Sequence, residues 1–384
     1  MKSAGLYLHI PYCVKKCAYC DFVSFPSAEG VPADYCAALL TEIALTAEAL
    51  PEREYATLFF GGGTPSLLSG AQMTELLRAL RLHFRIRPDA EITVECNPGT
   101  VTEEKLASYR AAGVNRVSVG LQSSDDGLLR TLGRIHDFAA FEDTVRLLRQ
   151  TGFQNFNVDV MHGLPEQTGA QYLDALRRAM DSGATHISAY GLILEEGTPL
   201  YRAVRAGRAL LPEEDETADM QDAGIDLLEQ NGFARYEISN FARAGFCCRH
   251  NLNYWANGEY VGLGLAAHSA MRQDGWTRWS NTEQPRTYLA RLQAQRRPLA
   301  ETMRLPPIEE MFETVMLGLR TVRGVSLAGF QARFGAALPD VYGEAVGELG
   351  DRGWLDESAL AAGFLALNRR GLDLQNAALQ YFLS

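Results

Sequence analysis

The sequence lacks long apolar runs and any excess of positive charge. No segment approaches the roughly 20 apolar residues that span a bilayer, so we expect no transmembrane segment. The chain has 36 Lys and Arg residues against 47 Asp and Glu residues, a formal net charge of −11. A surface that neutralises a phosphate backbone carries the opposite excess, so we expect no nucleic-acid partner. Peripheral membrane contact stays open.

Signals for export and for a disulfide framework are also missing. The N-terminus reaches His9 and Pro11 before an apolar segment long enough for a signal peptide develops. Cysteine is sparse, with 7 in 384 residues, and its number is odd. We therefore expect a cytoplasmic protein, in which a cysteine cluster indicates metal or redox chemistry. The choice between monomer and dimer is open.

The first 240 residues predict a layered α/β fold. Short apolar runs alternate there with longer amphipathic stretches, which is the pattern of βαβ units. Six such units predict a parallel sheet covered by helices, and their number favours a partial (β/α)6 barrel of the TIM type. The chemistry is then expected at the carboxyl ends of the strands. The expected strands are residues 6–10, 57–60, 91–95, 115–119, 155–161 and 186–190.

We divide the chain into three parts. Residues 1–240 form the partial barrel, 241–303 a loop-rich extension, and 304–384 a small, mostly helical domain with a winged-helix-like pattern. The adjacent Pro306 and Pro307 mark the second boundary, because they break any helix. A helix is expected over residues 308–322 and short strands over 353–355 and 364–367. The first turns of that helix are acidic, so we interpret the domain as a lid or a partner-docking surface.

Three cysteines follow the first expected strand. Cys13, Cys17 and Cys20 are spaced by four and then three residues. A short loop with this spacing turns three thiolates toward one point, as soft metals and iron–sulfur clusters require. A zinc site is the alternative, but no fourth ligand with clear spacing is present. Three ligands on a four-iron cluster leave one iron open.

These cysteines, and seven further motifs, make the chain similar to a known family. The loop resembles that of the radical S-adenosylmethionine (SAM) superfamily. The order and spacing of the other motifs resemble the oxygen-independent coproporphyrinogen III oxidase group and its HemW branch of haem chaperones, over nearly the whole chain. The resemblance implies a [4Fe-4S] cluster on the three cysteines, with SAM on the open iron. The motifs are residues 7–11, 61–66, 95–98, 120–123, 132–136, 159–165 and 250–255.

The resemblance also implies which residues bind SAM. Gly62, Gly63 and Thr64 match the segment that binds the methionyl amino end, and glycine lets backbone approach a ligand closely. Arg134 suits the methionyl carboxylate because its fork binds that group bidentately. The remaining implied contacts are Glu95 and Asp159, which accept from ribose hydroxyls or an amino group, and Gln122, Tyr7 and Tyr19.

One position departs from the oxidase pattern. Phe22 stands where the coproporphyrinogen oxidases have a fourth cysteine, and phenylalanine cannot replace a thiol in redox or ligand chemistry. We therefore expect a haem chaperone that binds haem and transfers it to an acceptor protein. The alternative is oxidative decarboxylation of coproporphyrinogen III by radical SAM chemistry, so whether the chain is an enzyme stays open.

The segment 246–255 is the candidate haem site. His250 is a candidate axial ligand, Arg249 a partner for a propionate, and Tyr254 an aromatic surface for the porphyrin. A thiol at Cys247 or Cys248 is a competing ligand. In the structural alternative, His250 only hydrogen-bonds a loop over the barrel mouth. The residues alone leave both interpretations open.

Overall fold

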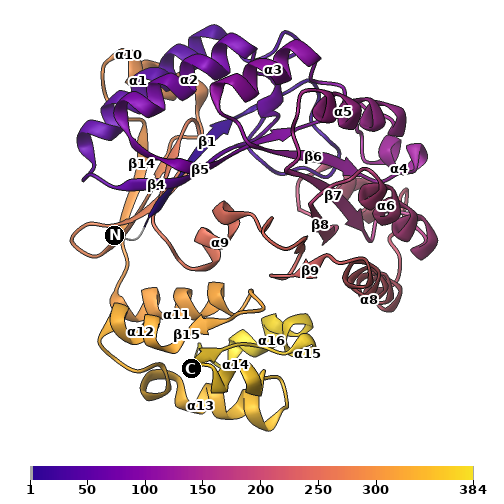
Figure 1. The fold of residues 1–384 in the computed structure, drawn as a ribbon, viewed down its shortest axis with the longest axis vertical. Helices are drawn as coiled ribbons and strands as arrows, with labels where there is room; N and C mark the ends of the chain where they lie inside the picture. Colours follow the sequence, from indigo (N-terminus) through magenta and orange to yellow (C-terminus); the bar gives the residue numbers. More distant parts are fainter. Residues whose placement is uncertain (1–2, 384) are drawn as a thin grey trace.

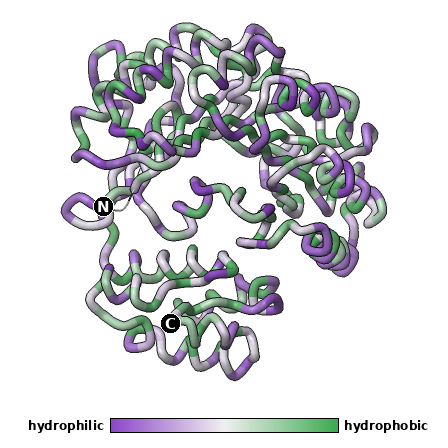
Figure 2. The backbone as a smooth tube through the Cα atoms, viewed as in Figure 1, coloured by the Kyte–Doolittle hydropathy of each residue, from purple (hydrophilic) through white to green (hydrophobic). Residues whose placement is uncertain are grey.

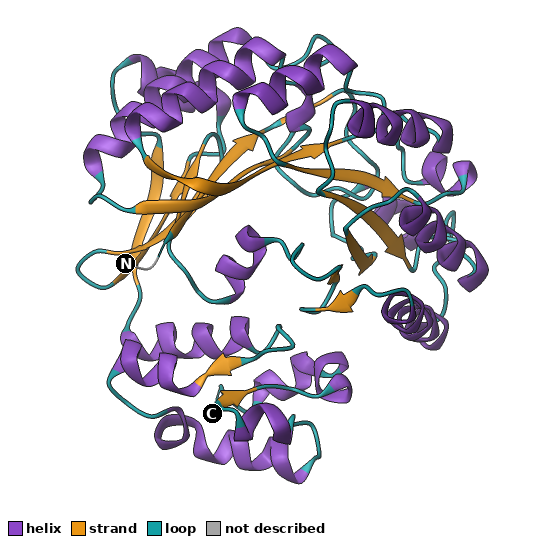
Figure 3. Cartoon of the chain, viewed as in Figure 1, coloured by secondary structure: helices purple, strands orange, loops and turns teal. Residues whose placement is uncertain are grey.

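The computed structural model describes residues 3–383 and contains one large curved sheet (Figure 1). Within these residues twelve strands form the sheet in the order β14-β13-β12-β11-β1-β4-β5-β6-β7-β8-β10-β9. Its ends do not meet, so the barrel is partial, as Figure 3 shows. The six central, parallel strands confirm the predicted fold. They are β1 (Ala4–Ile10), β4 (Glu54–Gly62), β5 (Arg85–Cys96), β6 (Arg116–Gln122), β7 (Phe156–His162) and β8 (His186–Gly191).

Helices cover the convex side of these strands. Several begin at side-chain caps: Ser69 and Thr168 form capping boxes and Asp137 accepts from the Ala140 N–H, which satisfies free N–H groups of the first turns. The outer helices are α1 (Ala33–Ala49), α2 (Gly70–His83), α3 (Glu103–Ala112), α5 (Phe138–Gln150), α6 (Gly169–Asp181), α8 (Glu214–Gln230) and α10 (Pro285–Gln293). Short elements lie in the connections: β2 (Tyr12–Cys13), β3 (Phe25–Pro26), η1 (Pro65–Leu67), α4 (Asp126–Thr131) and α7 (Pro199–Arg205).

The two faces of the central strands differ in polarity. Residues alternate between faces along a strand, so every second residue shares one face. The face toward the helices is apolar and forms the main core, and hydrophobic colour follows these strands in Figure 2. The concave face carries buried polar side chains, among them Thr57, Glu91, Arg116, Asn157 and His186. These polar residues share a face with the predicted site residues at the same strands' carboxyl ends.

The segment 241–303 is not loop-rich, so this description is corrected. It contains α9 (Arg249–Trp255) and continues the sheet, with β11 (Tyr260–Leu263) pairing parallel to β1. The physical reason is that β1 has a second edge whose backbone groups need partners. The other added strands are β9 (Ala234–Arg235), β10 (Asn240–Ala242), β12 (His268–Arg272), β13 (Trp276–Asn281) and β14 (Leu299–Arg304).

The C-terminal domain has its own hydrophobic core and is mostly helical, as predicted. The helix expected over 308–322 ends at Gly318, and the strand expected over 353–355 is only a bridge between Leu355 and Leu367. Its elements are α11 (Pro307–Gly318), β15 (Val325–Ser326), α12 (Leu327–Phe334), α13 (Leu338–Asp351), α14 (Glu357–Ala361), β16 (Phe364–Leu365), α15 (Arg369–Asp373) and α16 (Gln375–Gln380). Within residues 3–383, no helix has the length and apolar character needed to span a bilayer.

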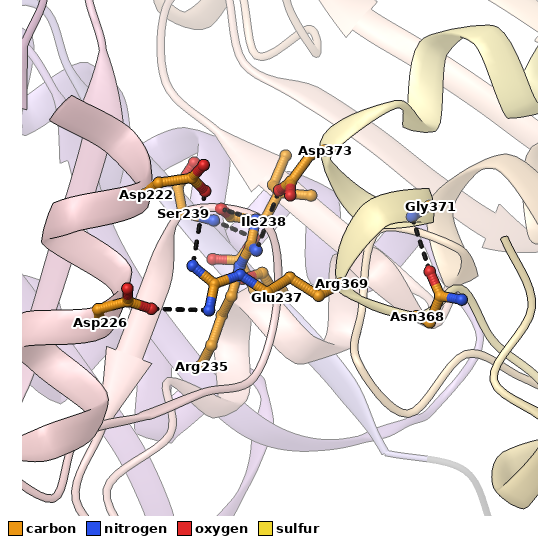
Figure 4. A network of polar contacts seen from close by, with 10 residues as sticks. All are labelled: Asp222, Asp226, Arg235, Glu237, Ile238, Ser239, Asn368, Arg369, Gly371 and Asp373. Atoms are coloured by element: carbon orange, nitrogen blue, oxygen red, sulfur yellow. Dashed lines mark hydrogen bonds and ion pairs between the residues drawn. The ribbon is translucent and has the colours of Figure 1, made fainter. Parts of the chain in front are cut away.

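Ion pairs join the C-terminal domain to the barrel (Figure 4). Arg369 on α15 pairs with Asp226 (2.7 Å) and Asp222 (3.5 Å) on α8, and all three side chains are exposed. Arg235 on β9 pairs with Asp373 at 3.3 Å, and only 5% of its side chain is exposed. One buried and one exposed arginine therefore dock the domain on this side, and on the other side Arg272 on β12 and Arg278 on β13 pair with Glu310 and Glu313 on the first helix of the domain.

Candidate functional site

A cavity of about 620 Å³ opens at the carboxyl ends of the central strands. This is the end at which parallel α/β folds bind ligands. The cluster loop, the end of β4 and the ends of β5 to β8 form its walls. All but one of the residues expected for the cluster and SAM line it: Cys13, Cys17, Tyr19, Cys20, Gly62, Gly63, Thr64, Glu95, Gln122, Arg134 and Asp159. Tyr7 is not among the lining residues, and its hydroxyl lies 3.0 Å from His9 Nδ1.

The three thiols of the cluster loop are partly exposed to the cavity. Burial raises the pKa values of the Cys13 and Cys20 thiols. The Arg134 guanidinium opposes this increase at Cys13, and its Nη1 donates to Cys17 Sγ at 3.6 Å. A cation beside the thiols favours the thiolates that an iron–sulfur cluster needs.

This donor set fits a [4Fe-4S] cluster with one open iron. Three soft thiols from one loop supply three of its four corners. Across residues 3–383, no three His, Cys, Asp or Glu side chains form a group that could hold a single metal ion. A four-iron cluster is larger than one ion and takes its thiolates on different irons.

Gly62 and Gly63 bring the end of β4 against the cluster loop. Gly62 has φ 107°, and a Cβ built there lies 2.5 Å from the His9 ring. A Cβ on Gly63 lies 2.7 Å from the Tyr12 backbone, and the Gly63 N–H donates to the Ile10 carbonyl at 2.9 Å. Both positions therefore require glycine for close packing as well as for access by a ligand.

Two partly buried carboxylates face the cavity. Burial and the neighbouring Asp159 raise the pKa of Glu95 to about 8, although Glu95 accepts from the Gly62 N–H at 3.2 Å. Burial also raises the pKa of Asp159, opposed by its hydrogen bond from Asn157 Nδ2 at 2.6 Å. A cationic ligand would stabilise the charged form of both groups. SAM carries such charge on its sulfonium and amino groups.

Arg134 is partly buried, and the protein provides partners for only some of its N–H groups. Its Nη2 donates to Asn97 Oδ1 (2.7 Å) and to the Gly120 carbonyl (2.8 Å), while its Nε has no partner. A buried, unpaired N–H in a cavity wall favours an anionic ligand group. Gln122 has φ 70°, rare for a residue other than glycine, and its Oε1 accepts from the Tyr190 hydroxyl at 2.9 Å.

Several lining residues were not predicted from the sequence. Asn97 links Thr64 Oγ1 (2.8 Å) to Arg134, and it lies within the 95–98 motif without having been assigned a role. For three of the other residues the only signal was a polar residue at or near the end of an expected strand, and Asn240 lacked even that signal. The others are Ser118, Ser188, Tyr190 and Asn240.

The candidate haem residues are not brought to this cavity. His250 is only 1% exposed and lies on α9, a helix rather than a loop. Its Nδ1 contacts Thr57 Oγ1 at 2.8 Å, its Nε2 contacts the Tyr254 hydroxyl at 3.0 Å, and its ring stacks on Phe59. Burial lowers the pKa of His250 to about 3. The geometry favours the structural alternative for His250, because neither ring nitrogen is free.

Arg249 is engaged in the same way. It is exposed, and it donates to the backbone carbonyls of Asp89 (3.0 Å) and Ala56 (2.8 Å). Together with the buried His250–Tyr254 pair, this anchors α9 against β4 and β5. The three residues expected at haem thus hold a helix in place on the concave face of the sheet (Figure 1).

The chain is similar to known proteins over nearly its whole length. Residues 7–179 match the model of the radical SAM superfamily, and residues 305–374 match that of the HemN C-terminal domain. The haem chaperone HemW of Escherichia coli is 37% identical over 99% of this chain and 98% of its own. The haem chaperone HemW of Bacillus subtilis is 34% identical, and the match covers 100% of this chain and 99% of the relative. The solved structure of coproporphyrinogen III oxidase HemN from Escherichia coli superimposes on 99% of this chain and 90% of its own length, with a TM-score of 0.83. The two sequences are 23% identical, so the comparison shows a shared fold.

Proposed function

Because this chain belongs to the HemW family of radical SAM proteins, we propose that it is a haem chaperone that binds haem and passes it to an acceptor protein. Relatives that match nearly end to end carry that name. The match includes the C-terminal domain as well as the barrel.

The barrel is proposed to hold a [4Fe-4S] cluster and SAM. Cys13, Cys17 and Cys20 would bind the cluster, and the cavity beside them would hold SAM. Cluster and SAM together supply one-electron chemistry, which belongs to the cofactors rather than the protein. The chain itself contributes a partly buried cation at Arg134 and two partly buried carboxylates, with which an amino-acid carboxylate and a sulfonium would pair.

The observation that favours the chaperone over the oxidase is the residue at the cavity mouth. Phe22 lines the cavity, and 64% of its surface is exposed. A phenyl ring at this place offers neither a proton nor a metal ligand, whereas it adds apolar surface that suits a porphyrin.

An anaerobic assay separates the two functions. Reconstituted protein is incubated with coproporphyrinogen III, SAM and a reductant, and the products are examined for vinyl groups. We expect no conversion, in the wild type and also in Phe22→Cys, because one thiol does not rebuild an active site. Conversion by the wild type would contradict the chaperone proposal.

A further inference from the structure

A series of hydrogen bonds through Cys248, Tyr236, His186, Asn157 and Asp159, here called the relay, leads from α9 to the SAM cavity. It begins at the backbone N–H of Cys248, the N-cap of α9, which donates to the Tyr236 hydroxyl at 3.3 Å. That hydroxyl lies 2.8 Å from His186 Nε2, and His186 Nδ1 lies 2.7 Å from Asn157 Oδ1. Asn157 Nδ2 lies 2.6 Å from Asp159 Oδ1 in the cavity wall.

In every hydrogen bond of the relay, the donor lies on the side of α9 and the acceptor on the side of Asp159. Asn157 donates from its amide nitrogen to Asp159 and to Ser118, so its oxygen must accept from His186 Nδ1–H. Burial holds the pKa of His186 well below its usual value, so the ring is neutral and its Nε2 can only accept. The Tyr236 hydroxyl therefore donates to His186. Each link polarises the next toward the Asp159 carboxylate.

Glu91 fixes the end of the relay that lies at α9. Its carboxylate accepts from the Arg249 N–H at 3.0 Å, the His250 N–H at 3.1 Å and the Cys248 thiol at 3.6 Å. This aims the Cys248 N–H at Tyr236. The helix that carries His250 is thus connected to the cavity rather than isolated from it.

We propose that His186 is a positioning residue for Asp159 and that α9 acts on the SAM site through it, an inference that rests on the SAM site proposed above. The relay holds Asp159 in one orientation and favours its ionised form. The charged and titratable groups around Asp159 are Glu95 on β5, Arg116 on β6, Arg134 after α4, Tyr190 on β8 and Tyr19 in the cluster loop. Of the elements that carry these groups, only β8 contributes a residue to the relay, namely His186.

The test compares two substitutions at His186 that differ in one hydrogen bond. His186→Asn places an amide nitrogen near the former Nδ1 and keeps the donor to Asn157, whereas His186→Leu removes it. His162→Leu is the control, because His162 is also a buried histidine but has no link to Asp159. Each full-length protein is reconstituted anaerobically, and its iron content and visible absorption are measured first.

SAM itself is then titrated, followed by the EPR spectrum of the reduced cluster. We expect His186→Leu to raise the Kd for SAM about tenfold at neutral pH, as loss of one buried hydrogen bond predicts. We also expect the rise of SAM affinity with pH to move to higher pH. His186→Asn should restore most of the affinity. A Kd for His186→Leu equal to that of His162→Leu would overturn the proposal.

Two further variants keep the outcome decisive. If His186→Leu fails to hold its cluster, Tyr236→Phe replaces it as the test, because it removes only the hydroxyl. We expect a few-fold rise in the Kd for SAM, and no rise would overturn the relay.

Asp159→Asn separates the two proposals. If Asp159→Asn leaves SAM binding unchanged, the proposed SAM site fails and the relay with it. If Asp159→Asn weakens SAM binding but the His186 and Tyr236 variants do not, the relay alone fails.

Discussion

At the residue scale, Glu95 makes ligand binding depend on pH. Its pKa is raised to about 8, so in the empty cavity it is largely protonated at neutral pH. A cationic ligand favours the charged form, and binding therefore releases a proton. The affinity for SAM should rise as the pH increases toward 8 and level off above it. SAM titrations between pH 6 and 9 measure this, with Glu95→Gln as the control in which the rise is reduced. If the affinity of the wild type for SAM does not change between pH 6 and 9, Glu95 is not a contact of SAM.

Single residues also mark where prediction from sequence stops. The cluster thiols and the strand-end motifs were predicted because their spacing is local. The burial of His250 was not predicted, because it depends on Thr57 and Phe59, which are about 190 residues away in the chain. Tyr190 was missed because one polar residue at a strand end carries no pattern, and Asn97 lies in the 95–98 motif but was given no role there. Only the fold brings these side chains to one cavity.

At the element scale, the end of β4 and the cluster loop are packed too closely for any side chain. Gly63→Ala places a Cβ 2.7 Å from backbone atoms of Tyr12, which cannot move aside as a side chain can. We expect a loss of about 1–3 kcal/mol in unfolding free energy and a lower iron content after reconstitution. Gly347→Ala is the matched control, because it lies on α13 with open space around it and should be neutral or slightly stabilising. Equal iron content in both variants would count against the packing argument.

The elements themselves were predicted unevenly, for a physical reason. The six central strands are buried on the helix side and read as apolar runs, so their positions were predicted within a few residues. The strands β11 to β14 were missed. β11 lies in a glycine-rich stretch, and most of β14 is exposed, so neither shows a clear apolar pattern. The short helix α9 was missed because its contacts are with distant strands rather than within its own segment.

At the scale of the whole molecule, two of the arginines that hold the C-terminal domain lie in different surroundings. Arg235 is nearly buried and pairs with Asp373, whereas Arg369 pairs in the open with Asp222 and Asp226. Removing one partner of a buried pair costs about 3 kcal/mol, and an exposed pair contributes less than about 1 kcal/mol. Arg235→Met should therefore loosen the domain far more than Arg369→Met. Proteolysis in the linker at Leu305 and Pro306, with denaturant unfolding, measures this. Equal effects of the two variants would contradict the account.

The barrel, the cavity and the docked domain form one molecule whose proposed task is to carry haem. The His250 ligand hypothesis requires the histidine to leave Thr57 and Tyr254, and so predicts that haem binding is lost in His250→Gln. The observed geometry predicts instead that this variant is less stable but takes up haem in the same amount.

The most direct test is an anaerobic haem titration of the cluster-loaded wild-type protein, followed by visible absorption. The account predicts a saturable, stoichiometric shift of the Soret band. If the wild-type protein takes up no haem, the chaperone proposal is contradicted.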